Sequence, residues 1–274
     1  MRQLYLVNEV GFTYFLDYRN STLISRINDL GIEKENTYLS YKDTYVKVDE
    51  KNPQKELQFD VVFLKGYKGY ENFIKFIRES NELRLFYKIG DEVKFVFVSF
   101  KSITKTELQS YTIQSTLVLD KLSLWINKVN YTVKVNVDSN GKVFPFPYPF
   151  TYSSSFNGEI VIRNDGEVKA PLNIRISGAV NKPRIDILRD GVVVTSMHLM
   201  VISSDCTIEV NSEESNQYMK MVEDGIERNI YQEQDFTCDN FLFVDKGEYT
   251  LRFIPGVNSK TECTIQLQEG YGGH

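Results

Sequence analysis

Strict alternation of apolar and polar residues is the feature that most restricts the fold of this 274-residue chain. In the clearest run, Tyr131, Val133, Val135 and Val137 alternate with polar residues, and Asn140-Gly141, a dipeptide typical of hairpin turns, follows. Further strands are predicted at 59–64, 82–87, 92–100, 113–119, 159–163, 172–177, 184–188, 192–195, 206–210, 226–231, 240–244, 248–253 and 261–267. Many short strands at this spacing are typical of β-sandwiches and β-barrels.

Helices are predicted to be rare. Alanine, the best helix former, occurs only twice, which agrees with a mainly β protein. One helix is predicted at 70–79, where apolar residues recur at helical spacing and form one face. A weaker pattern at 22–30 fits a helix with Ser21 as its cap, but its apolar face is narrow, so it fits an extended segment equally well.

The charge distribution argues against polyanionic partners. The formal net charge is −5, and it divides into +2 for residues 1–140 and −7 for the remainder. Neither part has the basic excess that neutralises phosphates, so we expect no binding to nucleic acid and none to an anionic membrane surface. The apolar stretch 191–204 is too short to span a bilayer, and no signal peptide is recognisable. We therefore expect the chain to fold in the cytoplasm of the cell that makes it.

Three prolines at alternate positions, Pro145, Pro147 and Pro149, mark the predicted domain boundary. Each fixes its own φ and biases the preceding residue towards extended backbone, so the segment is predicted to be stiff. We predict an N-terminal β domain at 1–143, a linker at 144–157 whose three prolines form the inter-domain hinge, and a C-terminal β-sandwich at 158–274.

The sequence contains few ingredients for catalysis. It has no metalloprotease, phosphate-loop or nucleophile-elbow motif, and its two histidines are His198, in a strand-like run, and His274, the last residue. Cys206 and Cys263 share the alternation phase of apolar neighbours, which predicts buried, inert thiols. We therefore predict no catalytic, cofactor-binding or metal site and no enzymatic activity.

Sugar binding is a separate hypothesis, because aromatic rings on a sandwich can stack on pyranose faces. The single tryptophan, Trp125, precedes the predicted linker and lies outside the C-terminal sandwich. Tyr218 and Tyr231 remain as candidate platforms, whereas Tyr249 alternates in phase with apolar residues and is predicted to lie in the core.

The order of short motifs resembles the distal tail protein (Dit) family of siphophages, the long, non-contractile-tailed phages, that infect Gram-positive bacteria. The motifs are Leu4-Tyr5-Leu6-Val7-Asn8, the stretch from Gly66-Tyr67 to Asn72-Phe73, Ile103-Thr104-Lys105-Thr106-Glu107, Leu124-Trp125, Ile162-Arg163-Asn164-Asp165-Gly166, Pro171, Gly178, Asn181-Lys182-Pro183, Lys246-Gly247, Tyr249-Thr250-Leu251 and Glu269-Gly270-Tyr271. In the Asn181 motif a lysine interrupts the family's Asn-Pro element.

The resemblance implies a particular architecture and role. It implies an N-terminal barrel-like or sandwich-like domain with one α-helix that forms a ring, a homo-hexamer in this family, and a galectin-like, carbohydrate-module-like C-terminal β-sandwich, or jelly roll. The ring would be a virion structural hub at the phage tail tip or baseplate, or in a phage-tail-like particle, that joins the tail tube to host-adsorption proteins. The implied partners are the tail tube protein, the tail-associated tip protein and a receptor-binding protein, with assembly in the bacterial cytoplasm.

Two other functions stay open at this stage. A carbohydrate-binding adhesin or accessory module that recognises cell-wall sugars is favoured by the predicted C-terminal sandwich. A cell-wall hydrolase has only the abundance of carboxylates in its favour, and adjacent pairs such as Glu213-Glu214 do not establish the separation that glycoside hydrolysis needs.

Overall fold

The computed structural model describes residues 2–135 and 157–273, which form two compact units. Unit 1 comprises 1–127 and 270–274, and unit 2 comprises 128–269, so the chain passes between the units twice. The predicted linker lies outside the described residues except for Asn157, and so do all three of its prolines. The division between the units falls inside strand β10 (Trp125–Lys134), because Trp125 belongs to the core of unit 1 and Val133 to that of unit 2. The alternation of apolar and polar residues along a strand does not show that its two ends are buried in different cores, so the sequence could not place the division there.

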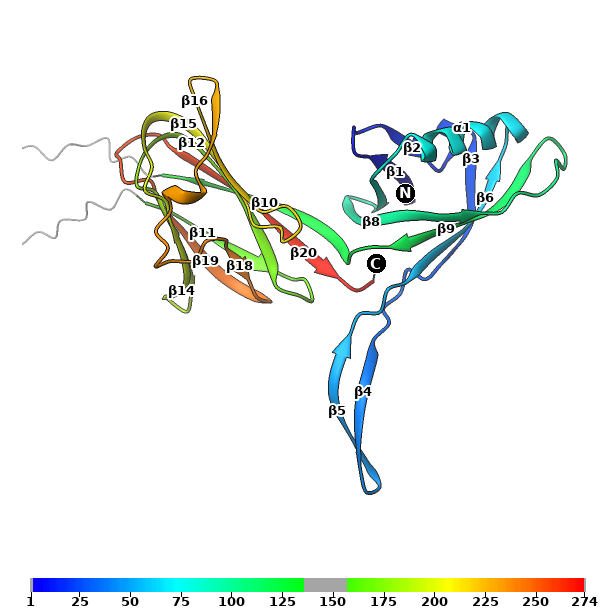
Figure 1. Ribbon diagram of the computed structural model, residues 1–274, viewed down its shortest axis with the longest axis horizontal. Helices are drawn as coiled ribbons and strands as arrows, with labels where there is room; N and C mark the ends of the chain where they lie inside the picture. Colours follow the sequence, from blue (N-terminus) through cyan, green and yellow to red (C-terminus); the bar gives the residue numbers. More distant parts are fainter. Residues whose placement is uncertain (1, 136–156, 274) are drawn as a thin grey trace, which may run out of the picture. The chain divides into compact units, whose positions relative to one another are not determined.

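Unit 1 is built on one antiparallel sheet in the order β3-β6-β9-β8-β7-β1-β2 (Figure 1). Its strands are β1 (Arg2–Asn8), β2 (Thr13–Phe15), β3 (Thr22–Asn28), β6 (Glu56–Phe63), β7 (Leu83–Ile89), β8 (Glu92–Ile103) and β9 (Ile113–Lys121). A 3-10 turn, η1 (Tyr18–Asn20), joins β2 to β3, and the first residues of β10 pair with β8.

The only α-helix of the described residues, α1 (Gly66–Arg78), covers the core of unit 1. Phe73 is fully buried, and its ring contacts Tyr14 at 5.2 Å and Phe63 at 5.7 Å between centroids. The first residue of the helix is glycine because φ is +54° there and a Cβ would lie 2.7 Å from Leu108 Cδ1. The helix expected at 70–79 is thus confirmed, with one extra turn at its start.

Most of the segment 22–30, residues 22–28, is extended, as the second of its two interpretations allowed. It forms β3 and pairs with β6 through Leu23↔Val62 and Ile27↔Phe59. Its narrow apolar face belongs to a strand that is half-buried on one side. Over so few residues, the spacing of apolar positions does not distinguish such a strand from a short amphipathic helix.

Unit 2 is a sandwich of two antiparallel sheets. One sheet has the order β17-β16-β15-β12-β20-β10, and the other has the order β11-β19-β13-β14. The strands are β11 (Gly158–Asn164), β12 (Ala170–Asn181), β13 (Arg184–Arg189), β14 (Val192–His198), β15 (Ile202–Asn211), β16 (Tyr218–Glu223), β17 (Ile226–Asn229), β19 (Gly247–Ile254) and β20 (Glu262–Tyr271); a short β18 (Phe243–Val244) pairs with β12, and η2 (Tyr231–Glu233) is a 3-10 turn.

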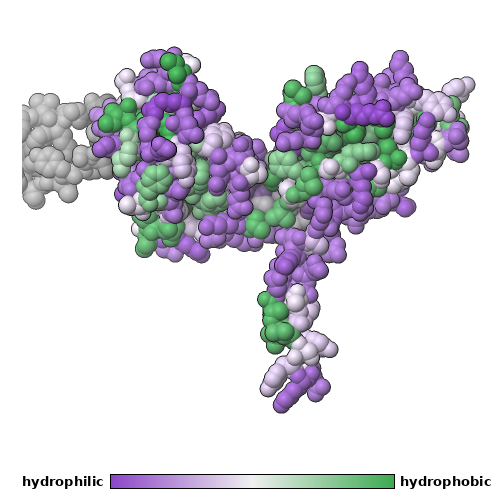
Figure 2. Space-filling model, in the orientation of Figure 1, coloured by the Kyte–Doolittle hydropathy of each residue, from purple (hydrophilic) through white to green (hydrophobic). Residues whose placement is uncertain are grey.

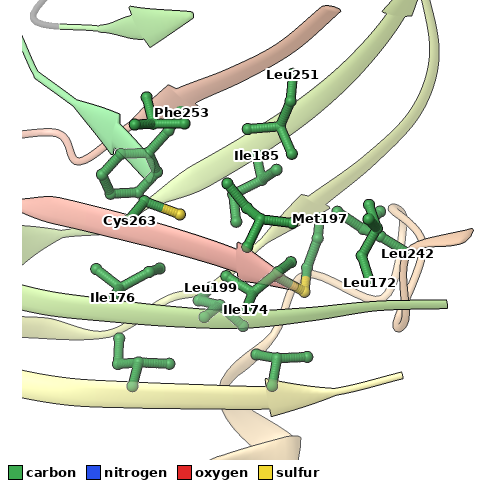
Figure 3. Close-up of a cluster of buried hydrophobic side chains, with 14 of the residues drawn as sticks. Leu172, Ile174, Ile176, Ile185, Met197, Leu199, Leu242, Leu251, Phe253 and Cys263 are labelled. Carbon is green, nitrogen blue, oxygen red and sulfur yellow. The ribbon is translucent and has the colours of Figure 1, made fainter. Parts of the chain in front are cut away.

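The core of unit 2 lies between these sheets. Ile174 and Ile176 of β12 face Leu251 and Phe253 of β19, and Cys263 of β20 fills the space beside them (Figure 3). Cys206 and Cys263 are buried as predicted, and burial raises the pKa of both thiols, so they stay protonated and inert. Tyr249 is also buried in this core. The mainly β class, with one helix and a C-terminal sandwich, is confirmed.

Replacing Phe73 with alanine should selectively destabilise unit 1. We expect a loss of about 3–5 kcal/mol in the free energy of unfolding, because the ring is fully buried and leaves a cavity. Trp125 is the only tryptophan and lies in the same core, so its fluorescence during denaturant titration reports the unfolding of unit 1. Lys75→Ala, on the solvent side of α1, is the control and should change the value by less than about 0.5 kcal/mol. Equal effects of the two variants would contradict this packing.

Candidate assembly surfaces

The residues singled out in the sequence do not gather into a chemical site. The described residues hold no group of three or more His, Cys, Asp or Glu side chains placed to bind a metal ion. His198 lies on β14 with Nδ1 3.6 Å from Asp235 Oδ2, and hydrogen bonds from Thr237, more than this histidine, lower the pKa of Asp235. Tyr218 and Tyr231 are partly exposed on separate elements. Within the described chain, no helix has the length and apolarity to cross a bilayer.

The features of unit 1 that stand out are two apolar surfaces outside its core. The first is a two-stranded hairpin of β4 (Glu35–Tyr41) and β5 (Thr44–Lys51), which stands clear of the main sheet (Figure 1). Nearly every residue of the hairpin is exposed. A lone two-stranded hairpin is marginally stable in water, so this element gains little from the rest of its own chain.

One face of this hairpin is apolar. Leu39 and Val46 are direct cross-strand partners, and Tyr41 follows Leu39 on the same side two residues on. Leu39, Val46 and Tyr41 are 63%, 56% and 68% exposed, respectively. Figure 2 shows the resulting apolar patch midway along the hairpin. Contiguous apolar residues that remain in water typically mark a contact with another molecule.

This hairpin has no signature of a strand pair in the sequence and was not predicted. Both of its faces are exposed, so no burial pattern separates them, and its two-residue turn is Lys42-Asp43 rather than a glycine dipeptide. Lys42 takes the left-handed conformation at φ +53°. The available signal was the density of β-branched and aromatic residues between 38 and 48.

The second surface is an aromatic stripe on the outer face of the main sheet, formed by Phe15, Tyr5, Phe86, Phe95 and Phe97. Phe15, Tyr5, Phe86 and Phe95 occupy one row of cross-strand partners through β2, β1, β7 and β8. Successive centroids along this row are 5.5, 4.9 and 5.2 Å apart, and Phe97 meets Phe95 edge-on at 5.7 Å.

This stripe lies on the side of the sheet opposite the core of unit 1. Alternate residues, such as Leu4, Leu6 and Leu85, point into the core, whereas no residue of the stripe belongs to it. Tyr5, Phe15, Phe86 and Phe97 remain half-exposed, whereas Phe95 is buried, with 6% of its surface exposed. The outer face of an antiparallel sheet is usually polar, so a row of aromatic rings there is unusual for a face that stays in water.

The side chain of Arg19 lies at one end of the aromatic stripe. The Arg19 guanidinium lies 3.4 Å from the centre of the Phe15 ring and pairs with Asp17. Arg19 donates hydrogen bonds to Asp17 and thereby lowers the pKa of that carboxyl group. The arginine is therefore held over the ring by a second interaction, and the stripe has a defined, positively charged margin.

The chain end also belongs to unit 1. The Tyr271 ring packs against the core, and Lys94 Nζ lies 4.3 Å from its centroid. Lys121 Nζ donates to the Gly272 carbonyl at 2.8 Å. Residues 270–273 therefore complete the same unit that carries both apolar surfaces.

Residues 3–122 match the family model described as the distal tail protein, N-terminal domain. No curated protein sequence matches the chain.

Solved structures with the same fold span almost the whole chain. A chain of the phage P2 baseplate in its activated conformation with Ca aligns with a TM-score of 0.65 at 16% identity, covering 97% of this chain and 98% of that one. The SPP1 Dit (gp 19.1) protein, described as a hub of the adsorption apparatus in phages that infect Gram-positive bacteria, aligns with a TM-score of 0.65 at 10% identity, covering 96% and 98%. At these identities the likeness establishes the fold, and residues 3–122 match the N-terminal domain of the distal tail protein family.

Proposed function

We propose that this chain is a structural protein of a phage tail tip, in which unit 1 forms a closed ring of six copies. The match of residues 3–122 to the N-terminal domain of distal tail proteins supports the structural role, and the two apolar surfaces of unit 1 support the ring. The role involves no catalysis. The ring would be assembled in the bacterial host and would join the tail tube to the tail-associated tip protein and to host-adsorption proteins, including a receptor-binding protein. The role of SPP1 Dit as a hub of an adsorption apparatus supports this placement.

The main support for a ring is that the two apolar surfaces of unit 1 differ in shape. A ring needs head-to-tail contacts, in which one patch of each copy meets a different patch of the next. The hairpin is narrow and projecting, whereas the aromatic stripe is broad and lies on a sheet. We assign Leu39, Tyr41 and Val46 of one copy to the aromatic stripe of its neighbour.

The charges beside the two surfaces suit this pairing. Arg19 marks one end of the stripe, and Arg84 lies on the same outer face of β7 as Phe86. The hairpin carries Asp43 at its tip, where no ion pair is formed within the described chain. A carboxylate that approaches an arginine at the rim of an apolar contact favours one orientation over others.

Breaking the apolar face of the hairpin should abolish the ring. We expect Leu39→Asp/Val46→Asp to remain folded, because both side chains are exposed, and to run as a monomer in native mass spectrometry where the unmodified protein gives closed rings. The matched control is Val192→Asp, which places the same charge at a 67% exposed valine of unit 2. Rings that survive the double substitution would contradict the assignment of the hairpin.

Shortening the aromatic stripe should weaken the same contact. Phe15→Ser removes the ring between Tyr5 and Arg19, and we expect about 0.5–1.5 kcal/mol less stability of unit 1. The protein concentration at which half the rings dissociate should rise at least about tenfold, a cost of about 1.4 kcal/mol per contact. Phe236→Ser, at a 60% exposed phenylalanine of unit 2, serves as the control. An unchanged dissociation curve for Phe15→Ser would exclude the stripe from the contact.

A further inference from the structure

The outer face of the larger sheet of unit 2 carries an unusual row of amide side chains. Asn173 of β12 is the cross-strand partner of Gln266 of β20, and Asn211 of β15 is that of Tyr218 of β16. Gln266 Nε2 donates to Asn130 Oδ1 of β10 at 3.0 Å. Asparagine is depleted in strands, so the backbone preference of these segments does not explain three asparagines and a glutamine on one face.

These amides line a hollow with a volume of about 290 Å³. This volume is near the lower end for small-molecule sites, about 300 Å³. The hollow crosses five strands, β10, β20, β12, β15 and β16, with Asn130 at one end and Tyr218 at the other. Five strands span about 19 Å at ordinary sheet spacing. The hollow therefore has the shape of a shallow trough that suits a short linear polymer rather than a single small molecule.

The amides are held in place by the protein and retain hydrogen-bonding capacity. Asn173 Oδ1 accepts from the Ser212 N–H at 3.2 Å, and Asn211 Oδ1 accepts from the Glu213 N–H at 3.0 Å. Asn173 is left with its Nδ2 donors, Gln266 keeps its Oε1 acceptor and Asn130 its Nδ2 donors, whereas Asn211 is largely buried, with 7% of its surface exposed. The row thus offers both donors and acceptors, which is what a hydroxyl group needs, since it donates one hydrogen bond and accepts others.

Charges beside the hollow cancel one another. Arg175 donates to Glu209 at 2.7 Å, and Lys220 lies 3.2 Å from Glu209 and 3.1 Å from Glu227. Two cations and two carboxylates leave no net charge to attract an anionic ligand. At the end of the row, the half-exposed Tyr218 ring offers an apolar face next to polar groups.

From this geometry we infer that the hollow binds a neutral oligosaccharide, with the amide row receiving sugar hydroxyls and Tyr218 receiving the C–H face of one sugar ring. Hydroxyl-rich, uncharged and elongated ligands of this class match the mixed donors and acceptors, the cancelled charge and the length of the trough. The inference concerns unit 2 alone and does not depend on the proposed ring of unit 1.

The test uses the full-length chain and three neutral trisaccharides as probes: maltotriose, cellotriose and chitotriose. Saturation-transfer NMR should show binding of at least one of them, with a Kd below about 1 mM. Tyr218→Ala and Gln266→Ala should each raise that Kd at least about tenfold, whereas Tyr218→Phe, which keeps the ring, should stay within about threefold. Thr207→Ala lies on the same face of β15 outside the hollow and should leave the Kd unchanged.

Three results would overturn the inference. These are no saturable binding of any trisaccharide, binding that both alanine variants leave unchanged, and preferential binding of an oligo(glycerol phosphate), which would assign the surface to polyanions. Circular dichroism melting curves establish that each variant is folded before its affinity is measured. Because ring formation is scored separately by native mass spectrometry, loss of one property does not obscure the other.

Discussion

The register of β2, β1, β7 and β8 is the constraint on which the proposed assembly depends. Tyr5 is paired with Phe15 on one side and with Phe86 on the other, so the aromatic rings fall in one row, while Leu4 and Leu6 on the same strand enter the core. A slip of one residue would exchange the two faces of a strand. The same pairing that buries the leucines therefore also builds the outer aromatic stripe.

The different roles proposed for the two units follow from the side chains that each unit exposes on its surface. Unit 1 closes its core with α1 and still presents two apolar surfaces, whereas unit 2 has its core between two sheets and presents a row of amides on one outer face. An apolar surface suits a permanent contact with another copy, and a polar trough suits a hydrated ligand. The C-terminal residues, with Tyr271 packed in unit 1, tie the end of the chain to the unit that assembles.

The sequence was most informative where one face of a strand is buried. The alternation at 113–119 and 248–253 predicted β9 and β19, and the phases of Cys206, Cys263 and Tyr249 correctly placed them in the core. The order of short motifs indicated the same family whose N-terminal domain model matches residues 3–122. These signals are strong because burial selects one residue type at every second position.

The candidate surfaces were not predictable in the same way. The hairpin has no buried face and turns at Lys42-Asp43, and the aromatic stripe exists only through pairings between strands far apart in sequence, such as Tyr5 with Phe86. The amide row likewise joins Asn130 to Gln266 across 136 residues. Tyr218 was the one member of the polar trough that sequence reasoning had singled out. The hinge assigned to Pro145, Pro147 and Pro149 lies outside the described residues and stays a prediction.

The most direct measurement of the central claim is chemical cross-linking between copies. Thr44 lies on the apolar side of the hairpin, and Val7 lies on the same face of β1 as Tyr5, so Thr44→Cys and Val7→Cys place one thiol on each surface. Cys238→Ser removes the one native thiol that is not buried. With a thiol-reactive cross-linker, the variant that carries both new cysteines should give a ladder of covalent species that ends at the closed ring. Variants with a single new cysteine cannot extend beyond dimers. Intact rings in native mass spectrometry without such a ladder would contradict the contact between the hairpin and the aromatic stripe.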